Sequence, residues 1–184
     1  MTPLDRMLQQ WRMKKAAAFI PPKCRLLDIG CHQGELLLRL QQRIVSGVGI
    51  DPLCSAAAPA PHIQLLQGSF PEALASMPPF DVITALALVE HIPAEQKQPF
   101  FDACYQWLLP GGLLICTIPD KKVDRILDIL TQLKLVKGMS LEQHHGFEPS
   151  DSIGLASKAG FEMRKRQRFQ LGLNNVFVFQ KPGL

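Results

Sequence analysis

The sequence lacks any apolar run that approaches the roughly 18 residues needed to span a membrane. Its amino-terminal residues also lack the basic-then-apolar order of a secretory signal. None of its five cysteines forms a CxxC pair, and most of them lie in segments that resemble core strands or helices. We therefore expect a soluble, cytoplasmic protein with reduced thiols and no membrane span.

The sequence also has neither a strong charge excess nor a segment that resembles a linker. The formal net charge of the 184-residue chain is +4, and its basic residues are spread out, apart from a cluster at residues 164–168. Composition therefore does not indicate a nucleic-acid partner. The 47% hydrophobic content suffices for one ordinary core, so we expect residues 1–184 to form a single domain.

The GxGxxG fingerprint of dinucleotide-binding proteins is absent, but a related turn, DIGCHQG, occupies residues 28–34. The turn follows a short apolar run and precedes a helix-like stretch, which is where α/β proteins bind nucleotides. Asp28 stands where the strand ends, and its carboxylate would repel a pyrophosphate and attract a cation. The expected ligand is therefore a nucleoside with positive charge, and S-adenosylmethionine, with its sulfonium and ammonium groups, fits that description.

Apolar periodicity predicts alternating strands and helices, the pattern of a mostly parallel sheet with helices on both faces. Thr2 can cap a helix that precedes the first strand and places on one face Leu4, Met7, Leu8 and Trp11. Short strands rich in Val, Ile or Leu are predicted at residues 24–29, 45–50, 62–66, 80–86 and 112–118.

The remaining elements are predicted from helical spacing and turn residues. A helix is expected over residues 98–109, with Pro99 tolerated only in its first turn, and a turn at residues 109–112 follows it. Asp120 caps an amphipathic helix that ends near Gly138, and residues 139–150 form a loop. After a short helix at residues 150–159, strands at 161–169 and 176–180 form an antiparallel hairpin.

Six stretches in order resemble the class I S-adenosylmethionine-dependent methyltransferases over nearly the whole chain: LLDIGCHQGEL, VGIDP, QGSF, FDVITALALVEHIP, LLPGGLLICTIP and AGFEMRKRQ. Within that class the sequence is most similar to the group that contains the ubiquinone-biosynthesis O-methyltransferases. The resemblance implies a Rossmann-like three-layer αβα fold, with a seven-stranded, mostly parallel sheet whose last strand is antiparallel. It also implies that the cofactor binds across the carboxyl ends of the first strands.

Cofactor contacts are expected first at the DIGCHQG turn. Asp28 would favour the ammonium group, directly or through water, while Gly30 and Gly34 let the backbone approach the amino-acid portion, and Cys31 lies on the same turn. A sharp strand-to-helix turn without a ligand is the alternative.

The next contacts are expected after the second strand. Asp51, fixed by Pro52, is placed to accept both ribose hydroxyls, although an Asp before Pro also forms turns. Leu53 offers an apolar wall for adenine, with core packing as the competing interpretation.

The segment Gly68, Ser69 and Phe70 departs from the family pattern, because most relatives have an acidic residue after the glycine to bind the adenine amino group. Ser69 can still form a hydrogen bond with the base edge. Phe70 either stacks on the base or fills the core.

The candidate catalytic base follows a strand that ends at Leu86 beside the expected methyl group. Alignment of the acceptor with the carbon–sulfur bond can supply about 7 to 11 kcal/mol, and a base typically adds a factor of about 10² to 10⁴. Histidine suits neutral pH, so His91 is the leading candidate. The alternative is that Glu90 and His91 cap or bond within the next helix.

A second histidine pair, His144 and His145, lies in the loop that should border the acceptor pocket, so His145 is a further candidate base. A metal site built from these residues with Glu90 and His91 would resemble that of the RNA 3′-end 2′-O-methyltransferases. Ala87 occupies the place of one acidic ligand there, so we expect no metal. A solvated loop is the competing interpretation of the histidine pair.

Two further features bear on the acceptor. Apolar residues of the two extra helices are candidates to line its pocket, with plain core packing as the alternative: Met7, Trp11, Ile126 and Leu130. Arg164, Arg166 and Arg168 alternate along a strand and so share one face, which would bind a phosphate-bearing acceptor or RNA, or simply face solvent.

The sequence therefore predicts an S-adenosylmethionine-dependent methyltransferase that acts on a small, partly apolar acceptor, at oxygen. An RNA methyltransferase is an alternative if the arginine face is continuous with the cofactor cleft. A protein that binds the cofactor but serves as a regulatory or scaffold subunit is another. The sequence indicates neither the acceptor's identity nor an oligomeric state.

Overall fold

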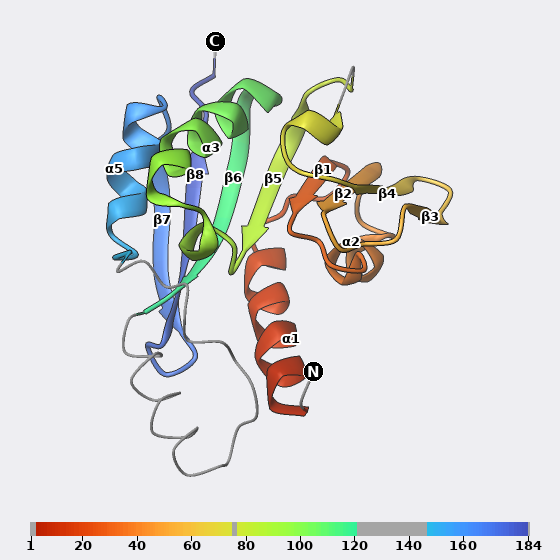
Figure 1. The fold of residues 1–184 in the computed structure, drawn as a ribbon, viewed down its shortest axis with the longest axis horizontal. Coiled ribbons are helices and arrows are strands. Elements are labelled where there is room, and N and C mark those ends of the chain that lie inside the picture. The colour runs from red at the N-terminus through yellow and green to blue at the C-terminus, as the bar shows by residue number, and fades with distance from the viewer. Residues whose placement is uncertain (1–2, 75–76, 121–146, 184) are drawn as a thin grey trace.

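The computed structural model describes residues 3–74, 77–120 and 147–183 (Figure 1). The helix expected after Asp120, with Ile126 and Leu130, lies outside these residues, as do His144 and His145. Within the described part, no helix is long and apolar enough to cross a membrane.

The centre of the molecule is an eight-stranded sheet with the order β3-β4-β2-β1-β5-β6-β8-β7. Its strands are β1 (Arg25–Ile29), β2 (Ser46–Asp51), β3 (Ala57–Ala60), β4 (Ile63–Gln67), β5 (Phe80–Leu86), β6 (Leu108–Pro119), β7 (Glu162–Phe169) and β8 (Asn174–Gln180). The five strands from β4 to β6 in this order are parallel, and β8 is antiparallel to both β6 and β7. The expected class I fold with its antiparallel last strand is confirmed.

The sheet has one strand more than predicted, because β3 pairs antiparallel with β4 at the edge, where Ala57 lies opposite Leu65 and Ala60 opposite Ile63. This edge strand reads AAPA and lacks the β-branched and aromatic residues that signal a strand. Its formation depends on pairing with β4 and not on its own propensity.

Helices cover both faces of the sheet (Figure 1), as the three-layer prediction requires. They are α1 (Pro3–Ala17), α2 (Glu35–Leu40), α3 (Ala94–Trp107) and α5 (Asp151–Lys158), with short 3₁₀ turns η1 (Glu72–Leu74) and η2 (Val89–His91). Buried residues of α1 and α2, such as Met13 and Leu37, pack with Leu26 of β1 on one face. Phe101 of α3 packs on the opposite face with Phe177 of β8.

Helix α3 begins four residues earlier than the sequence predicted, directly after Pro93, so Pro99 is its sixth residue and lies beyond the first turn. A proline there cannot donate a backbone hydrogen bond to the preceding turn. The helix persists because Phe101 and Cys104 are fully buried against the sheet. Tertiary packing therefore outweighs the local cost of the proline.

The turn predicted at residues 109–112 lies inside β6. Phe80 pairs with Leu108 and Val82 with Leu113, so the ladder skips residues at this point and the segment forms a bulge in a longer strand. Turn residues within a strand are typical of β-bulges.

A second irregularity divides the three arginines of β7, which the sequence placed on one face. The pairing of β7 with β8 shifts register near Arg164, whose Nε donates to Gln180 Oε1 at 2.5 Å. Arg166 instead lies over the ring of Phe177, at 5.2 Å from its centroid, and Arg168 pairs with Asn175. Because Gln180 and Phe177 are three residues apart in β8, they face opposite sides, and Arg164 is separated from the other two arginines.

Candidate functional site

The DIGCHQG turn connects the carboxyl end of β1 to α2 and is held against β2. The amide groups of Gly30 and Cys31 both donate to the Ile50 carbonyl, at 2.8 and 3.3 Å. Gly34 precedes α2 with a φ of +80°, and a Cβ there would lie 2.9 Å from Leu65 Cδ2. The space beside Gly34 is thus filled by protein, so close packing of the helix on β4 explains this glycine without a ligand.

Asp28 is the buried acid of the site, with 4% of its surface exposed. Thr84 of the neighbouring strand β5 donates to Asp28 Oδ1 at 2.6 Å. The pKa of Asp28 is raised to about 7, chiefly by burial; the hydrogen bond from Thr84 lowers it, and the nearby carboxylates of Glu35 and Asp51 contribute smaller upward shifts. A cation beside Asp28 would offset this desolvation, which fits the ammonium group of the expected cofactor.

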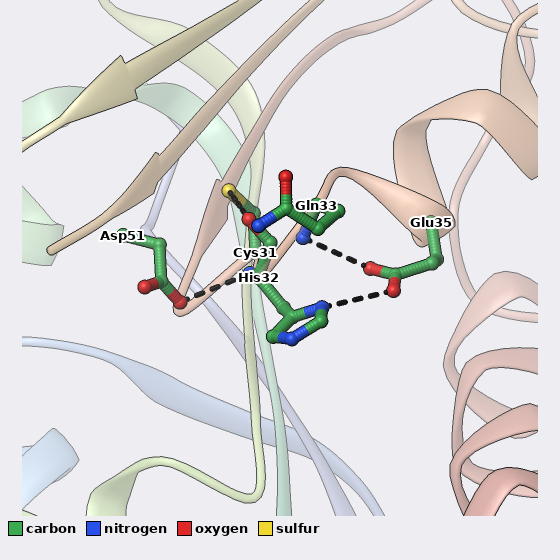
Figure 2. Close-up of polar contacts among 5 residues, drawn as sticks. All are labelled: Cys31, His32, Gln33, Glu35 and Asp51. Atoms are coloured by element: carbon green, nitrogen blue, oxygen red, sulfur yellow. Dashed lines mark hydrogen bonds and ion pairs between the residues drawn. The ribbon is translucent and has the colours of Figure 1, made fainter. Parts of the chain in front are cut away.

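His32 and Asp51 join the ends of β1 and β2 (Figure 2). The backbone N–H of His32 donates to Asp51 Oδ2 at 2.9 Å, and the His32 ring Nδ1 lies 3.0 Å from Glu35 Oε1. His32 has a φ of +51°, a left-handed conformation that non-glycine residues seldom adopt. These two contacts hold the exposed imidazole in place on the cofactor turn.

The Asp51 carboxylate stabilises a turn and can still accept further hydrogen bonds. Its Oδ1 accepts the Leu53 N–H at 2.8 Å, so the turn that the sequence offered as an alternative is present. Two of the roughly four lone-pair positions of a carboxylate are then used by backbone amides, and two are left for other donors. The Leu53 side chain is 83% exposed, so its interpretation as a core residue is wrong.

The segment after β4 returns to the same edge of the sheet. The Gly68 N–H donates to the Asp51 carbonyl at 3.3 Å, and the side chain of Ser69 is exposed. Phe70 packs edge-on against Phe100 of α3, with 5.8 Å between ring centroids, which favours the core interpretation of this aromatic residue.

A cavity of about 150 Å³ lies between the turn and α1. Four of its lining residues were expected from the sequence as cofactor contacts: Asp28, Gly30, Cys31 and Leu86. Cys31 contributes from a buried position, and burial together with Asp28 raises the pKa of its thiol, so the thiol is protonated at neutral pH.

Sequence reasoning missed the residues that α1 brings to this cavity, which are Gln9, Arg12 and Met13. Gln9 and Arg12 are polar, and only the folded chain reveals that this part of the helix lies across the cavity from Asp28 and Leu86. Met7 and Trp11, which the sequence assigned to an acceptor pocket or to core, are 53% and 42% exposed and line a separate groove on the other side of the helix.

His91 ends η2, which follows β5, and its side chain is exposed. His91 is not one of the residues that line the 150 Å³ cavity. Pro93 is the residue that precedes α3, so Glu90 and His91 belong to a separate turn and not to the cap of that helix.

Lys97 holds this turn from α3, and the sequence gave no sign of its role. Its ammonium group donates to the Val89 carbonyl at 2.9 Å and to that of Ile92, and lies 4.6 Å from the centroid of the Phe147 ring. Lys97 is 4% exposed, and burial lowers its pKa. The buried Lys97 thus fixes the backbone of the turn that contains His91.

The expectation that no metal is bound stays a prediction. In the part of the chain that the structure describes, no group of three or more His, Cys, Asp or Glu side chains could hold a metal ion. His144 and His145, the remaining candidate ligands, lie outside that part, as does the candidate base role of His145.

Comparison with known proteins identifies relatives over most of the chain. A family model described as a methyltransferase domain matches residues 4–166. The ubiquinone biosynthesis O-methyltransferase of Pseudomonas fluorescens (strain SBW25) is 35% identical over 153 residues, which cover 76% of this chain and 65% of the relative. The mitochondrial enzyme of that name from Rattus norvegicus is 33% identical over 138 residues, which cover 68% and 37%. The chain thus spans less than two thirds of the length of these relatives.

Solved structures share the fold at low sequence identity. A methyltransferase of Haloferax volcanii, solved with the Trm112 methyltransferase activator, has a TM-score of 0.74 at 14% identity and covers 95% of this chain and 91% of its own. The 1,6-didemethyltoxoflavin-N1-methyltransferase of Burkholderia thailandensis has a TM-score of 0.71 at 14% identity, covering 97% and 81%. The chain therefore belongs to the methyltransferase-domain family, as its motifs predicted, and its cofactor is S-adenosylmethionine.

Proposed function

We propose that this protein transfers the methyl group of S-adenosylmethionine to an oxygen of a small, partly apolar acceptor. The observation that carries the proposal is the buried Asp28 carboxyl, which lines a cavity directly beside the Asp51 turn. This arrangement provides an anionic group for the ammonium and a separate carboxylate for the ribose.

The proposed cofactor pose assigns one chemical task to each residue. Asp28 attracts the ammonium group, and Arg12 from α1, which lines the same cavity, receives the carboxylate of the amino-acid portion. Asp51 accepts the two ribose hydroxyls with its remaining lone pairs, and Leu53 covers adenine with its exposed side chain. Gly68 and Ser69 flank the base edge beside Asp51.

In this proposal the acceptor approaches from the side of η2. Leu86 at the end of β5 lies against the cavity, so the transferable methyl group would point toward the turn that carries His91. His91 would take the proton of the acceptor hydroxyl while the acceptor oxygen bonds to the methyl carbon and the carbon–sulfur bond breaks, with S-adenosylhomocysteine as the leaving group. Lys97 keeps the turn in position through the carbonyls of Val89 and Ile92.

The choice of oxygen rests on relatives in sequence and not on the fold. The matched relatives are ubiquinone biosynthesis O-methyltransferases, whereas the solved neighbours include N-methyltransferases. The RNA alternative loses its support, because β7 is the outermost strand and its bulge separates Arg164 from Arg166. A role limited to cofactor binding is distinguished from catalysis only by measurement of turnover.

Calorimetric titration with S-adenosylmethionine tests the first step. The unaltered protein is expected to bind, and Asp51→Ala to bind at least about tenfold more weakly, since hydrogen bonds to a charged group contribute about 1.5 to 3 kcal/mol. Glu162→Ala, an exposed acid on β7, is the control and should bind as the parent does. Absence of binding by the parent would overturn the proposal.

Turnover then tests the acceptor and the base. Radiolabel transfer from S-adenosylmethionine is expected into a small, partly apolar acceptor that carries a hydroxyl group, and not into RNA. His91→Ala should lower kcat by about 10² to 10⁴ while cofactor affinity is unchanged. Undiminished turnover of this variant would remove His91 as the base, and labelled RNA would favour the alternative.

A further inference from the structure

The outer face of α1 carries two large apolar side chains that the fold leaves in solvent. Met7 and Trp11 are four residues apart, so they lie on one side of the helix, and they are 53% and 42% exposed. They line a groove of about 560 Å³ that runs along α1 to Arg39 of α2. A different face of α1 packs in the core of the protein through Met13, Ala16 and Ala17.

The same groove is lined by three cations and by no acidic residue of the described chain. Lys14 and Lys15 stand in the last turn of α1, one turn beyond Trp11, and Arg39 closes the groove from α2. Apolar and basic side chains thus occupy one continuous surface, which we call the α1 face: Met7, Trp11, Lys14, Lys15 and Arg39. The charge of this face fits an anionic partner.

A further apolar side chain projects from the same end of the molecule. Leu171 is 96% exposed at the tip of the β7–β8 hairpin, in a left-handed conformation with a φ of +56°. The neighbouring Gln170 donates through Nε2 to the Leu8 carbonyl at 3.0 Å, so the hairpin tip lies against α1. Figure 1 shows that α1 and this hairpin both extend beyond the end of β5.

We propose that the α1 face docks on the surface of an anionic lipid bilayer, with Trp11, Met7 and the nearby Leu171 in the boundary between headgroups and acyl chains. Surface-lying helices combine large apolar residues, tryptophan in particular, with lysine and arginine that contact anionic headgroups. An acidic peptide would satisfy the cations. It would not explain Leu171, which protrudes from a hairpin tip, whereas a fluid bilayer accommodates protruding apolar side chains.

Docking in this way places the cofactor cavity close to the lipid. The opposite face of α1 supplies Gln9 and Arg12 to that cavity, so the thickness of one helix separates the bilayer from the site. If the proposed function is correct, a partly apolar acceptor reaches the methyl group from the membrane. The docking itself does not depend on that function.

Co-sedimentation with vesicles tests the docking without any measurement of methyl transfer. The protein is expected to sediment with phosphatidylcholine vesicles that contain about 30% phosphatidylserine, and to stay in solution with phosphatidylcholine alone. The double substitution Lys14→Glu with Lys15→Glu should lower the partition coefficient at least about tenfold. A higher salt concentration should also weaken vesicle binding by the unaltered protein, because salt screens the attraction between the cations and the headgroups. Met7→Ser with Trp11→Ser should lower binding at every salt concentration.

Matched exposed residues elsewhere provide the controls. Lys158→Glu on α5 and Val45→Ser before β2 change charge or apolarity away from the α1 face and should leave sedimentation unchanged. Circular dichroism of each variant verifies folding. The proposal is overturned if the unaltered protein does not sediment with the anionic vesicles at low salt, or if the Lys14 and Lys15 variant binds equally well. Binding to polyglutamate without binding to vesicles would also contradict the proposal and would indicate an acidic protein partner.

Discussion

At the scale of single residues, we expect the protonation of Asp28 to link the stability of the protein to cofactor binding. The pKa of this carboxyl is raised by burial to about 7 in the folded chain, whereas the unfolded chain holds it near its ordinary value. Between these two values the native state binds the extra proton, so the stability of the free protein falls as pH rises from about 4 to 7. Below that window the group is protonated in both states and adds no pH dependence.

The affinity for S-adenosylmethionine should therefore rise with pH up to about pH 7, by at most tenfold per pH unit. The physical reason is that only the ionised Asp28 attracts the ammonium group. Calorimetry across pH 5.5 to 7.5, about two units, measures this slope. In Asp28→Asn the slope due to this carboxyl disappears. A parent affinity that does not change with pH would show that Asp28 does not exchange its proton for the cofactor.

At the scale of elements, the cofactor turn is shaped by how closely β1, β2 and β4 pack. A Cβ at Gly49 of β2 would lie 2.7 Å from Cys31 Sγ and 2.8 Å from Leu65 Cδ2. Such distances leave no room for a methyl group unless neighbours move. The residue that makes room for the turn thus lies in an adjacent strand, within the VGIDP stretch, and only the folded chain shows that it packs against Cys31.

Gly49→Ala should lower the free energy of unfolding by about 1 to 3 kcal/mol, because a methyl group overpacks this part of the core. It should also weaken cofactor binding, since Cys31 belongs to the turn. Urea unfolding and calorimetry measure the two effects.

Gly154→Ala on α5 is the control, because nothing lies within 4 Å of a Cβ at that position. It should be neutral or stabilise by up to about 1 kcal/mol through helix propensity. Equal stability of Gly49→Ala and the parent would contradict the packing argument.

At the scale of the whole molecule, the last hairpin holds the first helix over the site. Gln170 donates to the Leu8 carbonyl and accepts from Asn174 Nδ2 at 3.2 Å, so it connects residues 162 positions apart in sequence. Because α1 supplies Arg12 to the cavity, we expect the position of the hairpin to affect cofactor binding.

Gln170→Ala should accelerate hydrogen exchange in the first turns of α1 and weaken cofactor binding several-fold. The loss of stability should be about 1 kcal/mol, the contribution of a typical hydrogen bond. Gln167→Ala, an exposed glutamine on β7, is the control. If α1 exchanges at the parent rate in Gln170→Ala, the hairpin does not hold the helix.

The limits of sequence reasoning are visible at particular residues. The strand ends at Asp28 and Asp51 were predictable, because a carboxylate after a buried strand and beside a turn is a local pattern. Arg12 and Lys97 were not, because a polar residue on a helix gives no sign of which strand or turn it will meet. The single face expected for the β7 arginines was wrong, because a bulge changes side-chain alternation without a mark in composition.

The sequence by itself determined the alternation of strands and helices, the antiparallel last strand and the cofactor class, because these follow from local periodicity, turn chemistry and short motifs. Only the tertiary structure decided that α1 covers the Asp28 cavity with Arg12 while Met7 and Trp11 face outward. Such placement depends on packing between segments that are far apart in the chain. It is set by the sum of many contacts, and no local stretch of residues encodes it.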